Sequence, residues 1–261
     1  MAVSVVRLNV TPVKGFSLAH PSEVALTPIG VPENRRFYLI DAQGAMVSAD
    51  RFGPLQRIRA ETDPGGLSLT FTFPDGSVVA GDAAPTDEAV TTDFYGRPVT
   101  SHHVNGPFAQ ALSDYVGFEV HLVRTDEPGE GSDVHRLTLV SRASVAELGR
   151  AGGAEGELDA RRFRMLFELD GCAAYEEDTW DGRLLQVGGA AIRVCGQVPR
   201  CVITTQSPQS GLKDFETLKV LATSRGRMAD LAGLPFGMYG EVERTGTVRV
   251  GDTVTLLRSE G

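Results

Sequence analysis

Cys201 is the side chain whose type and neighbours are best suited to chemistry. It follows Arg200 directly and precedes a short run rich in β-branched residues. A cation beside a thiol favours the thiolate, which is the form that binds metals and attacks electrophiles. Most cysteines next to an arginine are merely packed, so the pair supports a functional hypothesis only together with other residues.

Other basic residues stand beside positions that ought to be buried. Lys14 lies in the segment 11–15, Arg36 opens a predicted strand, and Arg164 follows Phe163 at the start of another. Any one of them could cap a sheet or pair with a carboxylate. Several together, in a chain of net charge −9, indicate an anionic ligand that carries a phosphate.

The composition limits the class of protein. The chain has 261 residues, enough for one large domain or two closely joined small ones. A net charge of −9 argues against a broad basic face for nucleic acid. The first ten residues lack the long apolar stretch of a signal peptide, and apolar runs elsewhere are too short to span a bilayer. We therefore expect neither nucleic acid nor a membrane among the partners.

The cysteine count favours a reducing compartment. The chain holds three cysteines, and an odd number in a chain of this length is not typical of a disulfide framework. We therefore expect a cytoplasmic protein. Cys172 and Cys195 are expected to pack as small hydrophobic residues, because their spacings to Cys201 do not form a zinc pattern.

Turn residues divide the chain into the short elements that must position these side chains. The 30 Gly and 14 Pro indicate many turns. Alternating apolar residues on both sides of a turn predict hairpins over residues 37–48, 67–80, 183–194 and 247–257. Helical spacing predicts helices over 107–116, 141–150 and 214–225, the second with Ser144 as N-cap and Glu147 completing a capping box. Hairpins this closely spaced favour a small barrel.

The order of motifs resembles that of the MOSC proteins, named for the C-terminal domain of molybdenum cofactor sulfurases. The likeness is greatest to the mitochondrial amidoxime-reducing components and their bacterial relatives, and it runs over nearly the whole chain. Seven segments carry it, in this order: Pro12-Val13-Lys14, Arg36-Phe37-Tyr38, Arg162-Phe163-Arg164, Glu177-Asp178-Thr179-Trp180, Arg200-Cys201 with Thr204-Thr205, Phe236-Gly237-Met238-Tyr239, and Gly246-Thr247-Val248-Arg249-Val250-Gly251-Asp252. No single segment is very specific, but their common order is.

The resemblance implies a fold as well. We expect a mixed α/β, predominantly β chain, in which a MOSC β-barrel is joined to an N-terminal MOSC N-like β-rich subdomain. The expected division places the N-terminal subdomain in residues 1–125 and the MOSC domain in residues 126–261.

The resemblance further implies a site for a molybdenum cofactor, which is molybdenum carried by a pterin (molybdopterin). Cys201 becomes the catalytic residue and the protein ligand to the metal, a role that suits a soft thiolate. The predicted cofactor-binding residues, carried over by motif, are Lys14, Arg36, Arg164, Arg200, Tyr239 and, with weaker support, His135. A histidine in the position of His135 is more often a loop residue that makes one backbone hydrogen bond.

Three positions depart from the family pattern. The amidoxime reducers carry proline and then asparagine where this chain has Met165 and Leu166. The aspartate that usually precedes the first paired arginine is replaced by Arg35. These changes put the details of cofactor binding and the substrate preference in doubt, but they do not involve Cys201.

The implied activity is that of a molybdenum-dependent oxidoreductase that reduces N-hydroxylated or N-oxide small molecules. The sequence has no cluster of cysteines for an iron–sulfur centre. Electrons are therefore expected from a separate donor protein, such as a ferredoxin, a flavodoxin or a cytochrome b5-like protein with its reductase.

Two alternatives remain open. The protein could be a sulfur carrier or cofactor-handling protein with a persulfide on Cys201. Pyridoxal phosphate binding accompanies that role in the sulfurases, but this chain has no pyridoxal-binding half to generate the sulfur. It could also be a degenerate member of the fold that binds a different small molecule, as the exchange at Met165 and Leu166 suggests.

Overall fold

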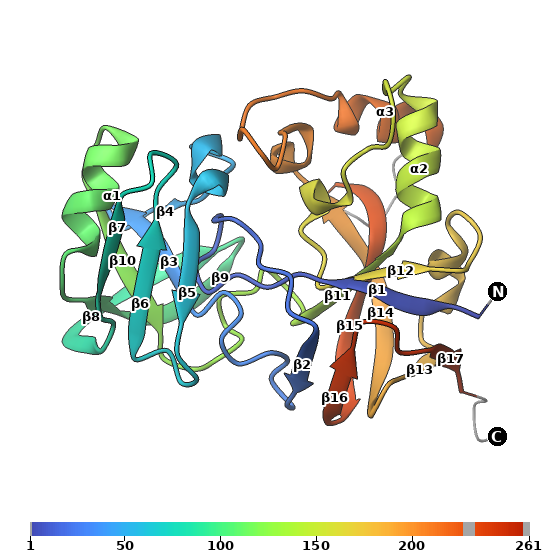
Figure 1. The fold of residues 1–261 in the computed structure, drawn as a ribbon, viewed down its shortest axis with the longest axis horizontal. Coiled ribbons are helices and arrows are strands. Elements are labelled where there is room, and N and C mark those ends of the chain that lie inside the picture. Colours follow the sequence, from blue (N-terminus) through green and yellow to red (C-terminus); the bar gives the residue numbers. More distant parts are fainter. Residues whose placement is uncertain (1, 227–232, 258–261) are drawn as a thin grey trace.

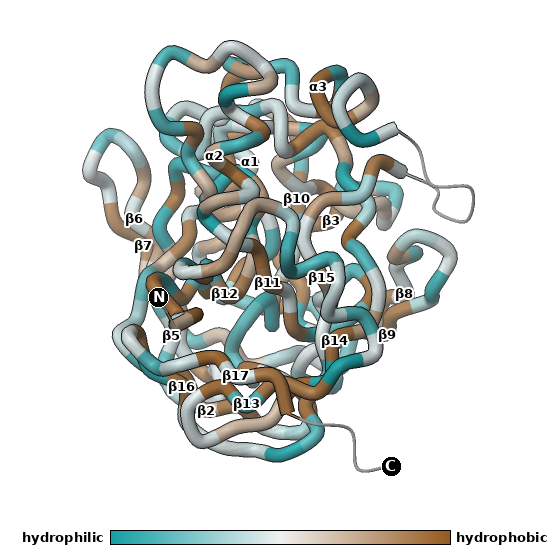
Figure 2. The backbone as a smooth tube through the Cα atoms, turned by 90° about the vertical axis from the view of Figure 1, so that its right-hand side faces the viewer, coloured by the Kyte–Doolittle hydropathy of each residue, from teal (hydrophilic) through white to brown (hydrophobic). Residues whose placement is uncertain are grey.

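The computed structural model describes residues 2–226 and 233–257. The chain is mostly β and forms two bodies side by side, each built around its own sheets (Figure 1). Along the strands, brown and teal segments alternate closely in Figure 2. Strand β2 (Glu23–Leu26), for example, alternates exposed and buried residues, as expected of strands with one buried face.

The C-terminal body is a seven-stranded sheet that curls into a nearly closed barrel. Its strand order is β1 (Ser4–Leu8), β12 (Phe167–Asp170), β11 (Leu137–Ser141), β15 (Leu234–Arg244), β14 (Ala190–Arg200), β13 (Leu184–Val187) and β17 (Val254–Leu256). The first and last strands meet where the Val254 amide donates to the Val3 carbonyl at 2.8 Å. Trp180, Phe167 and Ile192 are among the side chains that fill the core. The β-barrel expected in this part of the chain is thus confirmed.

The N-terminal body packs two sheets and a helix around an aromatic core. One sheet has the order β4 (Met46–Val47), β3 (Phe37–Asp41), β10 (Val120–Thr125), β9 (Arg97–Val104) and β8 (Pro85–Phe94), and the other has the order β5 (Arg59–Thr62), β6 (Ser68–Thr72) and β7 (Val78–Asp82). The ring of Phe71 lies 5.3 Å from that of Phe16 and 5.1 Å from that of Phe108, on helix α1 (Phe108–Val116).

The first two strands of the chain belong to the C-terminal body, and the N-terminal body follows them in the sequence. Strand β1 pairs with β12, and β2 pairs with β16 (Gly246–Arg249), although both begin the sequence. Figure 1 shows these two blue strands among the yellow and red ones. The two bodies also approach closely at two glycines, since a Cβ on Gly53 would lie 1.9 Å from the Gly211 carbonyl oxygen. Gln56 and Gln206 hydrogen-bond at 2.8 Å beside this contact.

Three of the four predicted hairpins are confirmed, namely β3–β4, β6–β7 and β13–β14. The fourth, over residues 247–257, is wrong, because β16 pairs with β2 while β17 pairs with β13. The turn between them bonds instead to β1, since Val5 accepts from Gly251 at 2.7 Å and donates to Asp252 at 2.9 Å. The two strands therefore pair with strands distant in sequence rather than with each other.

Helices α2 (Arg142–Ala151) and α3 (Thr217–Ser224) cover one end of the barrel, with short 3-10 helices η1 (Gly53–Arg57), η2 (Ala160–Phe163), η3 (Glu176–Trp180) and η4 (Val202–Thr205) in the connections. The predicted N-cap Ser144 is wrong, because Ser141 caps α2 by accepting from the Ser144 amide. Glu147 does not complete a capping box; Glu177 from η3 instead accepts from the Ser141 amide at 3.0 Å.

Candidate functional site

A cavity between the two bodies collects six of the seven predicted site residues. It contains about 730 Å³ of space, including its open mouth. The six are Lys14, His135, Arg164, Arg200, Cys201 and Tyr239. Residues separated by up to 225 positions in the sequence therefore share one hollow, and the seventh residue, Arg36, does not line it.

Cys201 lies between β14, which ends at Arg200, and η4, which begins at Val202, and it is exposed and lines the cavity. Desolvation in this recess raises the thiol pKa, and the carboxylates of Asp133 and Asp50 add to the effect. The Ile203 amide and Arg200 lower the pKa, but they do not outweigh the other groups. The expectation that Arg200 makes this cysteine a thiolate is therefore corrected. Arg200 lowers the thiol pKa by less than burial raises it, so the thiol form is favoured as long as no metal ion is bound to the sulfur.

Arg200 has a different task. Its Nε donates to the Phe236 carbonyl at 2.7 Å and its Nη1 to the Phe163 carbonyl at 3.0 Å. Its guanidinium carbon also lies 5.4 Å from the centre of the Phe163 ring. These bonds tie together three segments of the cavity wall, so Arg200 positions the backbone that presents Cys201.

Arg164 and Arg35 place two guanidinium groups at the cavity. Both residues have left-handed backbone conformations, with φ of 53° at Arg164 and 56° at Arg35, which residues other than glycine seldom adopt. Arg164 donates to the Phe16 carbonyl at 2.6 Å, and Arg35 donates to the Arg164 carbonyl at 3.0 Å. Burial, and then the charge of Arg35, lower the pKa of Arg164, so a bound anion would relieve an unfavourable concentration of positive charge.

Arg36 points away from the cavity. It donates to the Asp126 carbonyl at 3.0 Å and approaches the Thr125 hydroxyl at 3.5 Å. The motif match selected this arginine, but the left-handed backbone at Arg35 turns the two adjacent side chains in different directions. Arg35, which stands where the family usually has an aspartate, is the member of the pair that lines the cavity.

Lys14 is buried and forms an ion pair with Asp133. Its Nζ also donates to the Gly131 carbonyl at 3.1 Å. Desolvation lowers the pKa of Lys14, while Asp133 opposes the shift. Burial disfavours the Asp133 carboxylate, yet Lys14, Arg35 and Arg164 outweigh it and lower the pKa of that carboxyl. Asp133 was missed as a site residue, because an acid within a loop carries no spacing signal.

The comparisons with known proteins fit this geometry. Residues 126–255 match the model of the MOSC domain, and residues 2–119 match that of the MOSC N-terminal beta barrel domain. A Xenopus laevis protein named mitochondrial amidoxime-reducing component 1 is 30% identical over 286 residues, covering 98% of this chain and 82% of that protein. The chain belongs to the MOSC domain family.

Two further relatives of this MOSC chain differ in how much of their length is matched. The mouse protein of the same name is 27% identical over 283 residues, covering 97% of this chain and 82% of that protein. A molybdenum cofactor sulfurase of Drosophila erecta is 27% identical over 250 residues, covering 89% of this chain but 31% of that protein. The resemblance predicted from the motifs is thus confirmed at the level of the family.

Aromatic and polar side chains complete the cavity of this MOSC protein. Tyr239 on β15 is buried, and desolvation raises its pKa to about 12, so its hydroxyl keeps its proton and can donate. The His135 ring lies 4.9 Å from the Tyr239 ring. Tyr95, at the turn between β8 and β9, has a φ of 55° and is 63% exposed. Tyr95 and Asp50 were both missed by the motif comparison, because they belong to loops of the N-terminal body.

The charge of the lining favours anions. Four cationic side chains and two acidic ones line the cavity, giving a formal surplus of two positive charges in a chain of net charge −9. Of the three positions that depart from the family pattern, Arg35 and Met165 line the cavity, while Leu166 is buried in the barrel core. Among the described residues, none of the helices is long and apolar enough to cross a membrane.

Proposed function

We propose that this MOSC protein binds a molybdenum cofactor in the cavity, with the Cys201 sulfur as the protein ligand to the metal. The observation that carries the proposal is a single exposed cysteine in a cavity with a surplus of positive charge. The names of the relatives, amidoxime-reducing component and molybdenum cofactor sulfurase, support the same cofactor.

The residues fit such a group. Arg35 and Arg164 can donate charge-assisted hydrogen bonds to a phosphate, and Lys14 adds a third cation nearby. A metal at Cys201 would displace the proton that the raised pKa retains, as metal binding to thiols generally does. When bound, the cofactor supplies two-electron redox chemistry, and the protein supplies its position and surroundings.

We further propose that the reaction is the reduction of N-hydroxylated or N-oxide small molecules. The Tyr239 hydroxyl, which stays protonated, is placed to donate a hydrogen bond to a polar group in the cavity. Tyr95 lines the cavity and is largely exposed to solvent, so its ring can restrict what enters. We also propose that a separate donor, such as a ferredoxin, a flavodoxin or a cytochrome b5-like protein, delivers the electrons.

Metal analysis of protein produced with ample molybdate tests the proposal. We expect stoichiometric molybdenum in the wild type, its loss in Cys201→Ala, and its retention in Cys172→Ala, a half-buried cysteine beside the barrel core. Molybdenum that persists in Cys201→Ala would contradict the ligand assignment. Cyanide-labile sulfur on Cys201 without metal would instead support the sulfur-carrier alternative, to which the likeness to a sulfurase gives some weight.

Reduction of benzamidoxime with an artificial electron donor then tests the reaction class. We expect turnover by the molybdenum-loaded wild type and none by Cys201→Ala. Loaded protein that does not reduce benzamidoxime or an N-oxide would leave the cofactor assignment standing and reject the proposed substrate class.

A further inference from the structure

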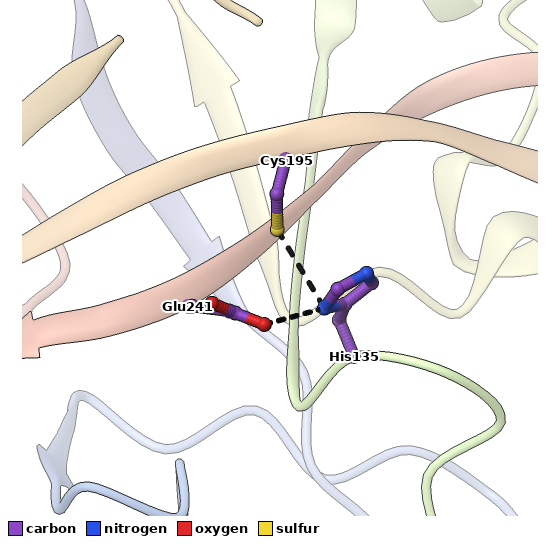
Figure 3. A group of neighbouring side chains, drawn as sticks. All are labelled: His135, Cys195 and Glu241. Carbon is purple, nitrogen blue, oxygen red and sulfur yellow. Dashed lines mark hydrogen bonds and ion pairs between the residues drawn. The ribbon is translucent and has the colours of Figure 1, made fainter. Parts of the chain in front are cut away.

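Three side chains with metal-binding atoms converge at one side of the cavity. Figure 3 shows His135, Cys195 and Glu241 pointing toward one another. The His135 Nδ1 lies 3.0 Å from Glu241 Oε1 and 3.6 Å from Cys195 Sγ. The three ligand atoms all lie within 4.8 Å of one another.

The sheet places these residues from three separate segments. Val194 pairs with Gly240 and Gln197 pairs with Met238, so β14 has one more residue than β15 between these pairs. This bulge includes Cys195 and Gly196, whose φ is 78°. Bulges re-aim side chains, and this one leaves the Cys195 sulfur beside His135.

Glu241 and Tyr239 occupy alternate positions of β15 and therefore share one face of the strand. His135 precedes β11, whose Leu137 pairs with Gly240. Its side chain accordingly reaches both neighbours on that face: the ring packs 4.9 Å from the Tyr239 ring, and Nδ1 faces the Glu241 carboxylate.

The distances suit a small tetrahedral cation. Zinc binds sulfur at about 2.3 Å and nitrogen or oxygen at about 2.0–2.1 Å, which separates a sulfur and a nitrogen ligand by about 3.6 Å and a nitrogen and an oxygen ligand by about 3.3 Å. The observed separations are 3.6 Å and 3.0 Å. Glu241 is 62% exposed, so its side chain is free to rotate and bring its carboxylate within range of a metal beside the sulfur.

We propose that His135, Cys195 and Glu241 bind a Zn²⁺ ion. One nitrogen, one sulfur and one oxygen ligand form a set that zinc accepts, and three protein ligands leave a fourth position open. Cys195 packs partly buried against a hydrophobic cluster, as expected, and the proposal adds a ligand role for its sulfur. A search for closely spaced cysteines and histidines could not find the set, because positions 135, 195 and 241 meet only in the folded sheet.

The proposed ion uses none of the side chains that the proposed function assigns to the metal and the phosphate of the cofactor. His135 lines the cavity and contacts Tyr239, so a cation on Nδ1 fixes the imidazole ring against that tyrosine. The zinc site depends only on these three side chains. It stands or fails separately from the proposed role of Cys201.

Cobalt titration of metal-free protein tests the site. The experiment uses a Cys201→Ala background, which removes the exposed thiol that would itself bind soft cations. We expect one Co²⁺ per chain with a thiolate-to-cobalt charge-transfer band, and displacement of that cobalt by Zn²⁺. A second change, Cys195→Ser, should abolish the band, whereas Cys172→Ser should leave it intact.

The other two ligands supply an independent measurement. Competition with a chromophoric chelator should show Zn²⁺ affinity falling at least about tenfold in Glu241→Gln and in His135→Ala, since even second-shell changes at metal sites cost that much. Glu241 is exposed, so its variant is expected to fold normally. A cobalt spectrum unchanged by Cys195→Ser, or a zinc affinity unchanged by Glu241→Gln, would overturn the proposal. So would a Cys201→Ala protein that binds neither cation.

Discussion

The two walls of the cavity are built in different ways. On the barrel side, Arg200 donates hydrogen bonds to two backbone carbonyls and holds the backbone around Cys201, while Arg164 reaches across to the Phe16 carbonyl of the N-terminal body. On the N-terminal side, Lys14 pairs with the loop residue Asp133, and Tyr95 stands exposed at a turn. The barrel wall presents the thiol on a hydrogen-bonded backbone, while the N-terminal wall contributes charged side chains and an exposed tyrosine. Neither wall forms the cavity alone, so the docking of the two bodies should control its function.

The strongest way to break this arrangement is Gly53→Ala. The new Cβ would meet the Gly211 carbonyl oxygen at 1.9 Å, so backbone in one body or the other must move. We expect a loss of about 3 kcal/mol or more in unfolding free energy, at or above the upper end of the usual overpacking cost, together with loss of ligand binding. Chemical denaturation measures it.

Gly81→Ala is the matched control. Its Cβ would meet only side chains, the nearest atom being Pro107 Cδ at 3.2 Å, within the N-terminal body. We expect a loss below about 1 kcal/mol, as for a modest local crowding. Equal losses in the two variants would show that the contact between the bodies has no special importance.

The pair Arg35 and Arg36 sharpens the comparison on the N-terminal side. Arg35→Gln should reduce retention of the molybdenum cofactor about tenfold, equivalent to about 1.4 kcal/mol, because a cation is removed from the cavity. Arg36→Gln should leave retention per folded molecule nearly unchanged, because this side chain bonds to residues 125 and 126 outside it. Measured cofactor content that depends on Arg36 rather than Arg35 would restore the motif-based assignment.

The reactivity of Cys201 measures how far the acidic groups influence the thiol. Because the pKa of Cys201 is raised, alkylation by iodoacetamide at pH 7.5 should be slower than that of a free cysteine and should accelerate as pH rises. Asp133→Asn removes a charge that raises the pKa, so the rate profile should move to lower pH and the rate at pH 7.5 should increase a few-fold. The assay requires Cys172 and Cys195 changed to serine.

Asp114→Asn, on the exposed face of α1, is the control for this series and should leave the profile in place. A profile that does not move in Asp133→Asn would mean that the Asp133 charge does not contribute to the raised thiol pKa.

The smallest effect is expected at Tyr95. Tyr95→Ala removes an aromatic ring from the cavity lining and leaves the backbone around Cys201 unchanged. The KM for benzamidoxime should therefore change about two- to threefold, while kcat changes little. Tyr95→Phe separates ring from hydroxyl and should behave like the wild type. A large fall in kcat for Tyr95→Phe would instead give the hydroxyl a part in the reaction.

Local patterns predicted the local structure well. Turn residues such as Pro74-Asp75-Gly76 located a hairpin, because turn chemistry depends on a few adjacent residues. The pairing of β16 with β2 could not be predicted, because the two strands are more than two hundred positions apart in the sequence. Likewise Glu177 completes the cap of α2 from another segment, a contact that no local motif encodes.

The cavity followed the same rule. Motif order selected Cys201, Arg164 and Lys14, which line one cavity, but it could not tell Arg35 from Arg36, because a left-handed backbone at Arg35 decides which side chain faces inward. Charge beside Cys201 was also misjudged from sequence, since adjacency to Arg200 says nothing of where the guanidinium points. Asp133 supplies a negative charge that became visible only in three dimensions.

The placement of β1 has a consequence for how the protein is made. Ser4 pairs with Asp170, so the first strand leaves the ribosome well before its barrel partner exists. During that interval the N-terminal body can assemble. Val5 and Leu8, which are fully buried in the folded protein, have no strand to pack against until β12 has been synthesised. Contacts this distant in sequence slow folding. Nascent chains halted before residue 167 should therefore expose that strand to proteases and chaperones, and release beyond it should hide it.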